Sequence, residues 1–460
     1  MFEVAEGRRG ALLGCLLSLA GTYAAAFTFF PVNPTPRGAL VVSGSVLALA
    51  IVLVPILRGL GGSRTVTNAE NFVAFGFVFW LLLDLIQGAY ALDEAKDDSL
   101  RMALVAIGIS AAAMWFGAAS PSWRIPQWIA DGIDVQLNAN TIAKAVPICF
   151  ALGMFNFLYS VDFDIPRMFS YVGQQRWAMP WGRGQLGGWE SFRDQAQYFG
   201  YVLPSLTALL IARRGLINFQ SLFAVFCSAI MLLFLSTGGG RRIVGVTAGA
   251  ALMVWVQANP GLRIRNFLIV GLGALALGWS AQFMLNIRTQ GYETFSQTES
   301  EYDYLHVDDN FLRLAQVIEL VPLRRPFVEH QQLMFTLVRP IPRVFWPGKP
   351  VSPGFDLPTE VGLKGVSLST SIVGEWYISY GWLAILFGGW LHGRLAVTAN
   401  TLRELGNRVG NPIVYSLAVM VLMAGQRSML DLVLMSYALV AWWAVSRYTA
   451  NRHSVVAYSR

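Results

Sequence analysis

The chain has 460 residues, of which 55% are hydrophobic and only 13% are charged, and its formal net charge is +7. Apolar runs of about 20 residues recur along it, which excludes an ordinary water-soluble protein and predicts a polytopic helical membrane protein. Segments of about ten residues with alternating apolar and polar side chains, typical of outer-membrane strands, are absent from the sequence.

The apolar runs predict about twelve membrane-spanning helices in a single all-α membrane domain, residues 1–460. Arg8 and Arg9 precede the first run, and no clear small-residue cleavage site follows it, so we interpret this run as an uncleaved helix. The expected helices cover residues 11–29, 38–57, 72–92, 102–118, 142–160, 198–212, 219–236, 243–257, 266–285, 371–391, 411–425 and 430–446.

Two hydrophilic segments, 161–197 and 286–370, interrupt this pattern. One set of connecting loops is rich in arginine and poor in acids, whereas the short loop 93–101 on the other side combines Lys96 and Arg101 with four acidic residues. Basic loops stay on the cytoplasmic side of a membrane. We therefore expect both termini in the cytoplasm, and both hydrophilic segments, including the large loop 286–370, outside.

Several arginines lie on the predicted outer side, against this bias. Those that adjoin spans are Arg241 and Arg242 in 238-GGGRR-242, Arg288, and Arg427. Guanidinium groups bind phosphate in bidentate fashion, and a cation at membrane depth usually has an anionic partner. We predict that these residues bind a lipid-linked phosphate or diphosphate. The alternative is that outer loops tolerate arginines, which pair with nearby acids.

The segment 161–197 combines aromatic rings with amides, arginines and carboxylates. Sugar rings stack on aromatic faces while their hydroxyls bond to polar neighbours. We predict sugar contacts from this segment, among them Arg183 and Trp189. An interfacial belt of aromatic residues is the alternative interpretation.

No metal or other cofactor is expected. Asp162 and Asp164 form an Asp-x-Asp pair like those that bind divalent ions, but this spacing arises often by chance. The cysteines all lie within apolar runs, so we interpret them as small buried residues without disulfides; they are Cys15, Cys149 and Cys227.

Two motifs late in the chain resemble a known family. The stretch 339-RPIPRVFWPGKP-350 resembles the Arg-x-Ile-Pro-Arg-x-Leu-Trp-Pro-x-Lys-Pro signature of O-antigen polymerases, the Wzy-type oligosaccharide repeat-unit polymerases. The stretch 370-TSIVGEWYISYG-381 resembles their Gly-Glu-x-Tyr-x-Asn-Phe/Tyr-Gly element. Phe345 replaces the usual Leu and Ser379 the usual Asn. The resemblance is sharpest over residues 339–390.

The resemblance implies a GT-C-like glycosyltransferase at the outer face of the bacterial inner membrane. Such an enzyme moves the growing glycan from undecaprenyl diphosphate onto a new lipid-linked repeat unit. The expected partners are this lipid-linked oligosaccharide, membrane lipids and a chain-length regulator, with no nucleic acid. The rival hypotheses are an O-antigen ligase, which uses the same donor, and a flippase, a transporter that would be expected to show internal repeats.

The resemblance also implies roles for particular residues. The prolines stiffen the loop that presents further diphosphate-binding cations. The reaction needs cations for the leaving group and a base for the acceptor hydroxyl, for which Glu375 is the first choice. The other bases considered are Asp308, His306 and Asp309, the further cations are Arg339, Arg343 and Lys349, and the further sugar contacts are Trp346 and Tyr377. The alternative roles are a helix start for Glu375 and a solvated turn for Asp308 and His306.

Overall fold

The computed structural model describes most of the chain, and every regular element in that part is helical. The described residues are 2–34, 38–61, 64–89, 92–133, 138–174, 178–181, 190–237, 240–260, 263–290, 304–363, 368–404 and 412–457. The predicted all-α class is confirmed.

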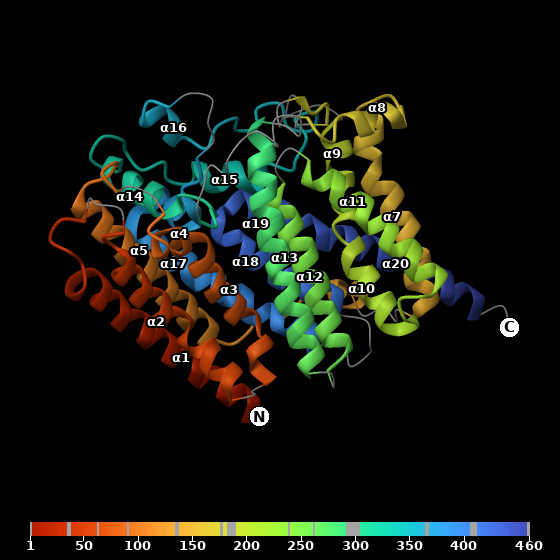
Figure 1. Cartoon of the computed structure of the whole chain (residues 1–460), viewed down its shortest axis with the longest axis horizontal. Helices are drawn as coiled ribbons and strands as arrows, with labels where there is room; N and C mark the ends of the chain where they lie inside the picture. Colours follow the sequence, from red (N-terminus) through yellow and green to blue (C-terminus); the bar gives the residue numbers. More distant parts are fainter. Residues whose placement is uncertain are drawn as a thin grey trace.

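The described residues of the first half of the chain form eleven α-helices with π or 3-10 turns between some of them (Figure 1). The elements are α1 Phe2–Tyr23, η1 Ala24–Thr28, α2 Val41–Leu60, η2 Arg64–Thr67, α3 Ala69–Phe77, η3 Val78–Leu82, α4 Leu83–Ile86, α5 Asp97–Ala119, α6 Gln127–Ile133, α7 Ala139–Tyr159, α8 Ile165–Ser170, α9 Glu190–Gly200, α10 Leu203–Arg214 and α11 Phe219–Ser236.

The second half continues in the same way. Its elements are α12 Arg241–Ala258, α13 Arg263–Gln290, α14 Asn310–Leu320, α15 Gln331–Val338, α16 Leu357–Glu360, α17 Ser371–Glu404, α18 Pro412–Ala424, η6 Gly425–Arg427, α19 Met429–Met435 and α20 Tyr437–Ala457. The large hydrophilic segment 286–370 therefore contains three short helices in its described part.

Eight helices in the described residues are long and apolar enough to cross a membrane. They are Gly7–Thr28, Val41–Leu60, Ala69–Ile86, Asp97–Ala119, Ala139–Tyr159, Phe219–Ser236, Ile264–Leu285 and Met429–Tyr448. The other four predicted ranges also fall on helices. Of these, α10 and α18 have 12 and 13 residues, α12 begins with two arginines, and α17 is interrupted at Tyr380 and Gly381.

The helix α18 lies between two hydrophobic cores. Tyr415, Val419 and Leu422 belong to the core formed with α1–α5, α14 and α17. Leu417 and Val421 belong to the core formed with α7 and α9–α12, together with α20. A helix that is apolar on all sides is stable only when protein or lipid surrounds it. The burial of both faces therefore fixes α18, and the turn η6 at its end, inside the molecule.

The helices α5 and α17 pack closely because α17 presents glycines. A Cβ atom at Gly393 would lie 1.9 Å from the carbonyl oxygen of Met114, and one at Gly389 would lie 2.4 Å from that of Ser110. The two glycines are four residues apart, the spacing that lets helix backbones approach each other in membranes. This contact joins the N-terminal helices to the late part of the chain.

The described parts of both hydrophilic segments lie at one end of the helices. In Figure 1, α8 and α16 lie at the upper edge and α15 in the upper part of the molecule, whereas the N-terminus lies at the lower edge. The two segments that the sequence predicts on the same side of a membrane are thus on the same side of the molecule.

Gly393→Leu is expected to destabilise the protein. The new side chain would press on the backbone of α5, and such overpacking costs about 2 kcal/mol or more. The measurement is the temperature at which the detergent-purified protein loses its size-exclusion peak. Gly271→Leu is the control, since nothing lies within 4 Å of a Cβ there. Equal losses in both variants would show that the α5–α17 contact is not the cause.

Candidate functional site

A cavity of about 920 Å³ runs between α3, α12, α13, α15 and α18. Its lining on α12 extends from Arg241 to Gln257, which corresponds to about 24 Å at 1.5 Å per residue. Most of the wall along this length is apolar, including Phe72, Phe75 and Met420. Charged side chains gather where α12 begins. The cavity therefore combines a charged end with a long apolar wall.

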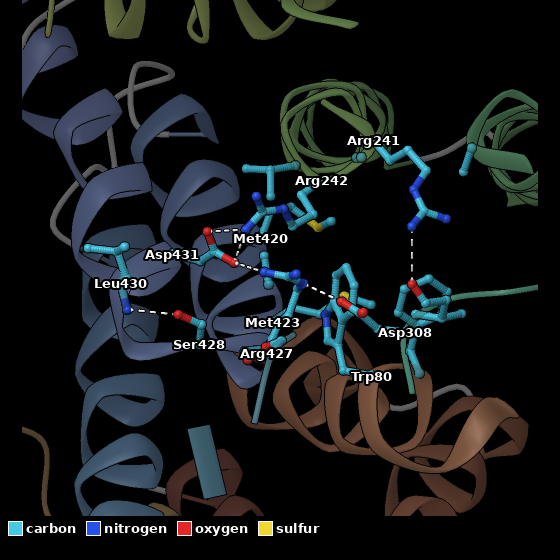
Figure 2. A pocket seen from close by; sticks show the side chains of 18 of the residues that line it. Trp80, Arg241, Arg242, Asp308, Met420, Met423, Arg427, Ser428, Leu430 and Asp431 are labelled. Carbon is cyan, nitrogen blue, oxygen red and sulfur yellow. Dashed lines mark hydrogen bonds and ion pairs between the residues drawn. The ribbon is translucent and has the colours of Figure 1, made fainter. Parts of the chain in front are cut away.

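An ion-pair cluster lies at the charged end (Figure 2). The Nε of Arg427 donates to Oδ2 of Asp308 at 2.5 Å, and its Nη1 donates to Oδ2 of Asp431 at 3.1 Å. Arg242 donates to both carboxylate oxygens of Asp431. Arg241 donates to the carbonyl oxygens of His306 at 3.0 Å and Val307 at 3.4 Å. Residues far apart in the sequence thus meet through guanidinium groups.

The cluster has more arginines than aspartates. Burial by itself raises the pKa of Asp308, but the charges of Arg427, Arg241 and Arg242 outweigh this and lower it below its ordinary value. Asp308 is therefore ionised at neutral pH. Arg242 and Arg427 share Asp431, Asp308 binds Arg427, and Glu375 lies in the same lining. Each guanidinium group has more N–H donors than these carboxylates use in the described residues, so donors remain for an anion.

The sequence around Arg427 explains its position. The helix α18 ends at Ala424 and continues as a 3-10 turn that carries Arg427. Ser428 then caps α19 by accepting from the backbone N–H of Leu430 at 3.0 Å. Asp431 follows one helical turn after Arg427, at the spacing that brings side chains together. The tight turn thus aims Arg427 and Asp431 at the same place.

Glu375, the first-choice base, lies near this turn. Its Oε2 accepts from the backbone N–H of Met429 at 2.6 Å, and the side chain also lines the cavity. The contact satisfies one of the N–H groups that the first turn of α19 leaves free. Glu375 therefore links the start of α17 to the start of α19.

The structure brings together six of the predicted site residues. Arg241, Arg242, Arg427, Glu375, Asp308 and His306 all line the same cavity.

The cations of the motif 339–350 lie outside this lining. Lys349 is buried, and its Nζ donates to the carbonyl oxygens of Arg339 at 2.9 Å and Ile341 at 2.7 Å. Burial, with Arg339 and Arg343 nearby, lowers the pKa of Lys349. The guanidinium of Arg339 lies over the ring of Phe335 at 5.0 Å. In the described residues the Lys349 ammonium group therefore binds backbone carbonyl groups of its own loop and does not face the cavity.

The predicted sugar contacts are dispersed. Trp346 lines a second pocket of about 490 Å³ with Phe327 and Pro350. Tyr377 is buried, and its hydroxyl donates to the carbonyl oxygen of Val321 at 3.1 Å. The remaining predicted site residues, Arg183, Trp189 and the side chain of Arg288, lie outside the described residues.

Carboxylates with metal-ligand spacing have protein partners. Asp164 caps α8 by accepting from the N–H of Arg167 at 3.0 Å, and Asp162 is exposed. In the described chain Asp84, His306 and Asp309 offer ligand atoms within 4.8 Å of one another. However, both oxygens of Asp84 accept from backbone N–H groups, and Asp309 pairs with Arg313 at 3.4 Å. We assign no metal to either group.

Two acids were not predicted from the sequence: Asp431, which lines the cavity, and Asp84, which binds the backbone of Asp308 from outside the lining. Asp431 stands four residues after Arg427, which is the spacing of a helical ion pair. Asp84 lies inside a predicted span, and an acid in such a position usually has a function or a partner. Both signals were present in the sequence.

Known proteins do not assign a function to this chain. No family model, no curated protein and no solved structure matches the chain. The family suggested by the motifs at 339–350 and 370–381 therefore stays a prediction.

Arg427→Gln is expected to destabilise the protein by about 2 kcal/mol or more, because Asp308 and Asp431 lose a charged partner in a poorly hydrated site. Asp308→Asn in the same chain should recover part of this loss, since the pair is then removed together. Thermal unfolding in detergent of the wild type, both single variants and the double variant measures the coupling.

The control cycle uses the exposed pair of Arg325 and Glu360, which lie 2.9 Å apart. Water screens this pair, so little coupling is expected there. Strictly additive losses for Arg427 and Asp308 would contradict a coupled ion pair at the cavity.

Proposed function

We propose that this protein is a membrane glycosyltransferase that polymerises oligosaccharide repeat units linked to undecaprenyl diphosphate. The observation that carries the proposal is the arginine cluster at one end of a long apolar cavity. A lipid diphosphate likewise has a charged part and an apolar part: a compact group with several negative charges is attached to a long hydrocarbon chain. The guanidinium donors of the cluster complement the anion, and the apolar wall complements the chain.

Arg242 and Arg427 are the proposed diphosphate ligands. In the described residues the Nη2 groups of both make no hydrogen bond, although the Nη1 groups bind Asp431. These donors can bind phosphate oxygens without first losing a protein partner. Arg241 is committed to the backbone at His306 and Val307, so we assign it a supporting role.

The proposed reaction is a substitution at the anomeric carbon of the growing glycan. A hydroxyl group of the incoming repeat unit attacks this carbon, and the bond to the phosphate oxygen breaks. Lipid diphosphate leaves with the bonding electrons, and its charge is stabilised by Arg242 and Arg427. The hydroxyl proton passes to a carboxylate. No oxidant, reductant or further group is needed.

Glu375 is the proposed base. A good base at neutral pH has a pKa near neutrality, whereas the arginines lower the pKa of Asp308. Asp308 is also bound to Arg427, so a proton on it would weaken that ion pair. Glu375 lines the same cavity and has no arginine bound to it in the described residues.

The proposed setting is the bacterial inner membrane, with the charged end of the cavity toward the periplasm and both termini in the cytoplasm. The excess of arginine in the predicted inner loops supports this orientation. In the proposed topology α10, α12, α17 and α18 complete about twelve membrane-embedded helices in a GT-C-like arrangement. A chain-length regulator is a proposed partner.

Arg427→Lys and Arg242→Lys are expected to reduce polymer formation about a hundredfold or more, because lysine keeps the charge but lacks the planar fork. The assay incubates purified protein with lipid-linked repeat units from its own host and resolves the glycan ladder by electrophoresis. Arg325→Ala is the control on the surface. Arg339→Ala separates the cavity from the motif loop: normal ladders are expected if the cavity holds the donor.

The same assay distinguishes the rival functions. Transfer of one glycan to added lipid A core without a ladder would indicate a ligase. No transfer by the wild type, with movement of the lipid-linked substrate across a vesicle membrane, would indicate a flippase. Either result would replace the proposed polymerase.

Glu375→Gln is expected to abolish chain extension while binding of the lipid diphosphate persists, because the amide keeps the size of the side chain but cannot accept the proton. Asp308→Asn is expected to reduce the rate without abolishing it. Initial rates and binding of undecaprenyl diphosphate are measured on the same preparations. If Glu375→Gln is active and Asp308→Asn is inactive, Asp308 and not Glu375 is the base.

A further inference from the structure

The segment that carries Asp308 is held by the end of the third apolar span. This span consists of α3, the π-helix η3 and α4; Asp84 lies in its last turn, and Gln87 follows its last residue, Ile86. Three groups on it, the carbonyl oxygen of Trp80 and the side chains of Asp84 and Gln87, contact residues 305–310. We name this contact the docking seam.

We propose that Asp84 is a positioning residue, which fixes the backbone at Asp308 so that the Asp308 carboxylate holds Arg427 in place for the diphosphate. The inference rests on the proposed function and adds to it a residue outside the cavity lining. It also assigns a purpose to an acid that lies in an apolar helix.

The contacts of Asp84 are suited to this role. Its Oδ1 accepts from the N–H of Val307 at 3.0 Å, and its Oδ2 accepts from the N–H of Asp308 at 2.9 Å. The side chain is 3% exposed. A carboxylate has two acceptor oxygens and can bind two consecutive N–H groups. An amide cannot do the same, since its NH₂ group would face one of the two donors.

The contacts of Gln87 and Trp80 fix the position of residues 305–310 along the end of the span. The side-chain amide of Gln87 both donates to the carbonyl oxygen of Leu305 and accepts from its N–H, each at 3.1 Å. Asn310 donates to the carbonyl oxygen of Trp80 at 2.8 Å. Together with the contacts of Asp84, these bonds connect positions 80, 84 and 87 of the span end to residues 305–310 in the reverse order. The loop therefore lies along the end of the span.

The π-helix η3, Val78–Leu82, comes immediately before α4, whose second residue is Asp84. A π turn contains one extra residue and so turns the following residues by about 100° relative to an uninterrupted α-helix. The direction of Asp84 thus depends on this irregular turn. Such turns occur frequently at functional sites.

The same segment is held from a second side by Arg241. Asp84 accepts from the N–H groups of residues 307 and 308, and Arg241 donates to the carbonyl groups of residues 306 and 307. Asp308 itself binds Arg427. Asp308 is the residue of this segment that contacts both Asp84 and Arg427, so removing its carboxylate tests whether Asp84 acts through it.

The first test follows backbone amide exchange, and it needs no enzymatic activity. In Asp84→Asn, peptides covering residues 304–310 are expected to exchange deuterium about tenfold faster or more, while peptides within α5 stay unchanged. Gln87→Ala is a second variant, at the exposed end of the seam, and should affect Leu305 in the same way. Asp98→Asn, at an exposed acid in the first turn of α5, is the control. Unchanged exchange at 304–310 in both seam variants would overturn the proposal.

The second test uses polymer formation and asks whether Asp84 acts through Asp308. Asp84→Asn should lower kcat about tenfold and change KM less than about threefold. In a chain that already carries Asp308→Asn, adding Asp84→Asn should change kcat less than about twofold. A merely structural role would reduce activity again in the double variant, and multiplied losses would overturn the proposal.

The two tests separate the seam from the function. If the wild type forms no polymer, the proposed function fails, and amide exchange still decides whether Asp84 holds the segment. If the wild type forms polymer but the double variant shows multiplied losses, the polymerase stands and the positioning role of Asp84 is wrong.

Discussion

The arrangement of the site depends on the need to pair the guanidinium group of Arg427. A cation at the edge of an apolar region is costly unless anions surround it. Asp308 and Asp431 provide them, and Asp431 also binds Arg242 at the start of α12. These contacts bring the segment around Asp308, α12 and α19 to one point. The end of the cavity is thereby shaped by charge pairing, whereas its walls are shaped by apolar packing.

The position of Arg427 is fixed because α18 cannot shift easily. One face of this helix packs in each of the two hydrophobic cores, so a movement would disturb both. Arg427 lies in the tight turn η6 directly after α18, so its backbone is held by this helix. Glu375 adds a contact from α17 to the first turn of α19. The catalytic groups that we propose thus lie on helix ends, which hold side chains more firmly than long loops do.

The sequence predicts helices better than it predicts partners. The range 219–236 coincides with α11, because a long apolar run has one stable backbone state in lipid. The convergence of Arg241, Arg242 and Arg427 also follows from their positions beside spans. The partners of Asp84 could not be predicted, since they lie more than 200 residues away and depend on a π turn. Lys349 illustrates a different limit: the prolines indicate a stiff loop, but they do not show that the lysine binds that loop's own carbonyl groups.

The helix α13 forms one wall of the cavity and packs chiefly on α12. Most of its remaining surface is open, and only 6% of its apolar stretch is buried. Val270, Ala274 and Ala281 line the cavity from this helix. Of the helices that line the cavity, α13 therefore has little protein on its far side, so that in a bilayer this part of the apolar wall is one helix thick.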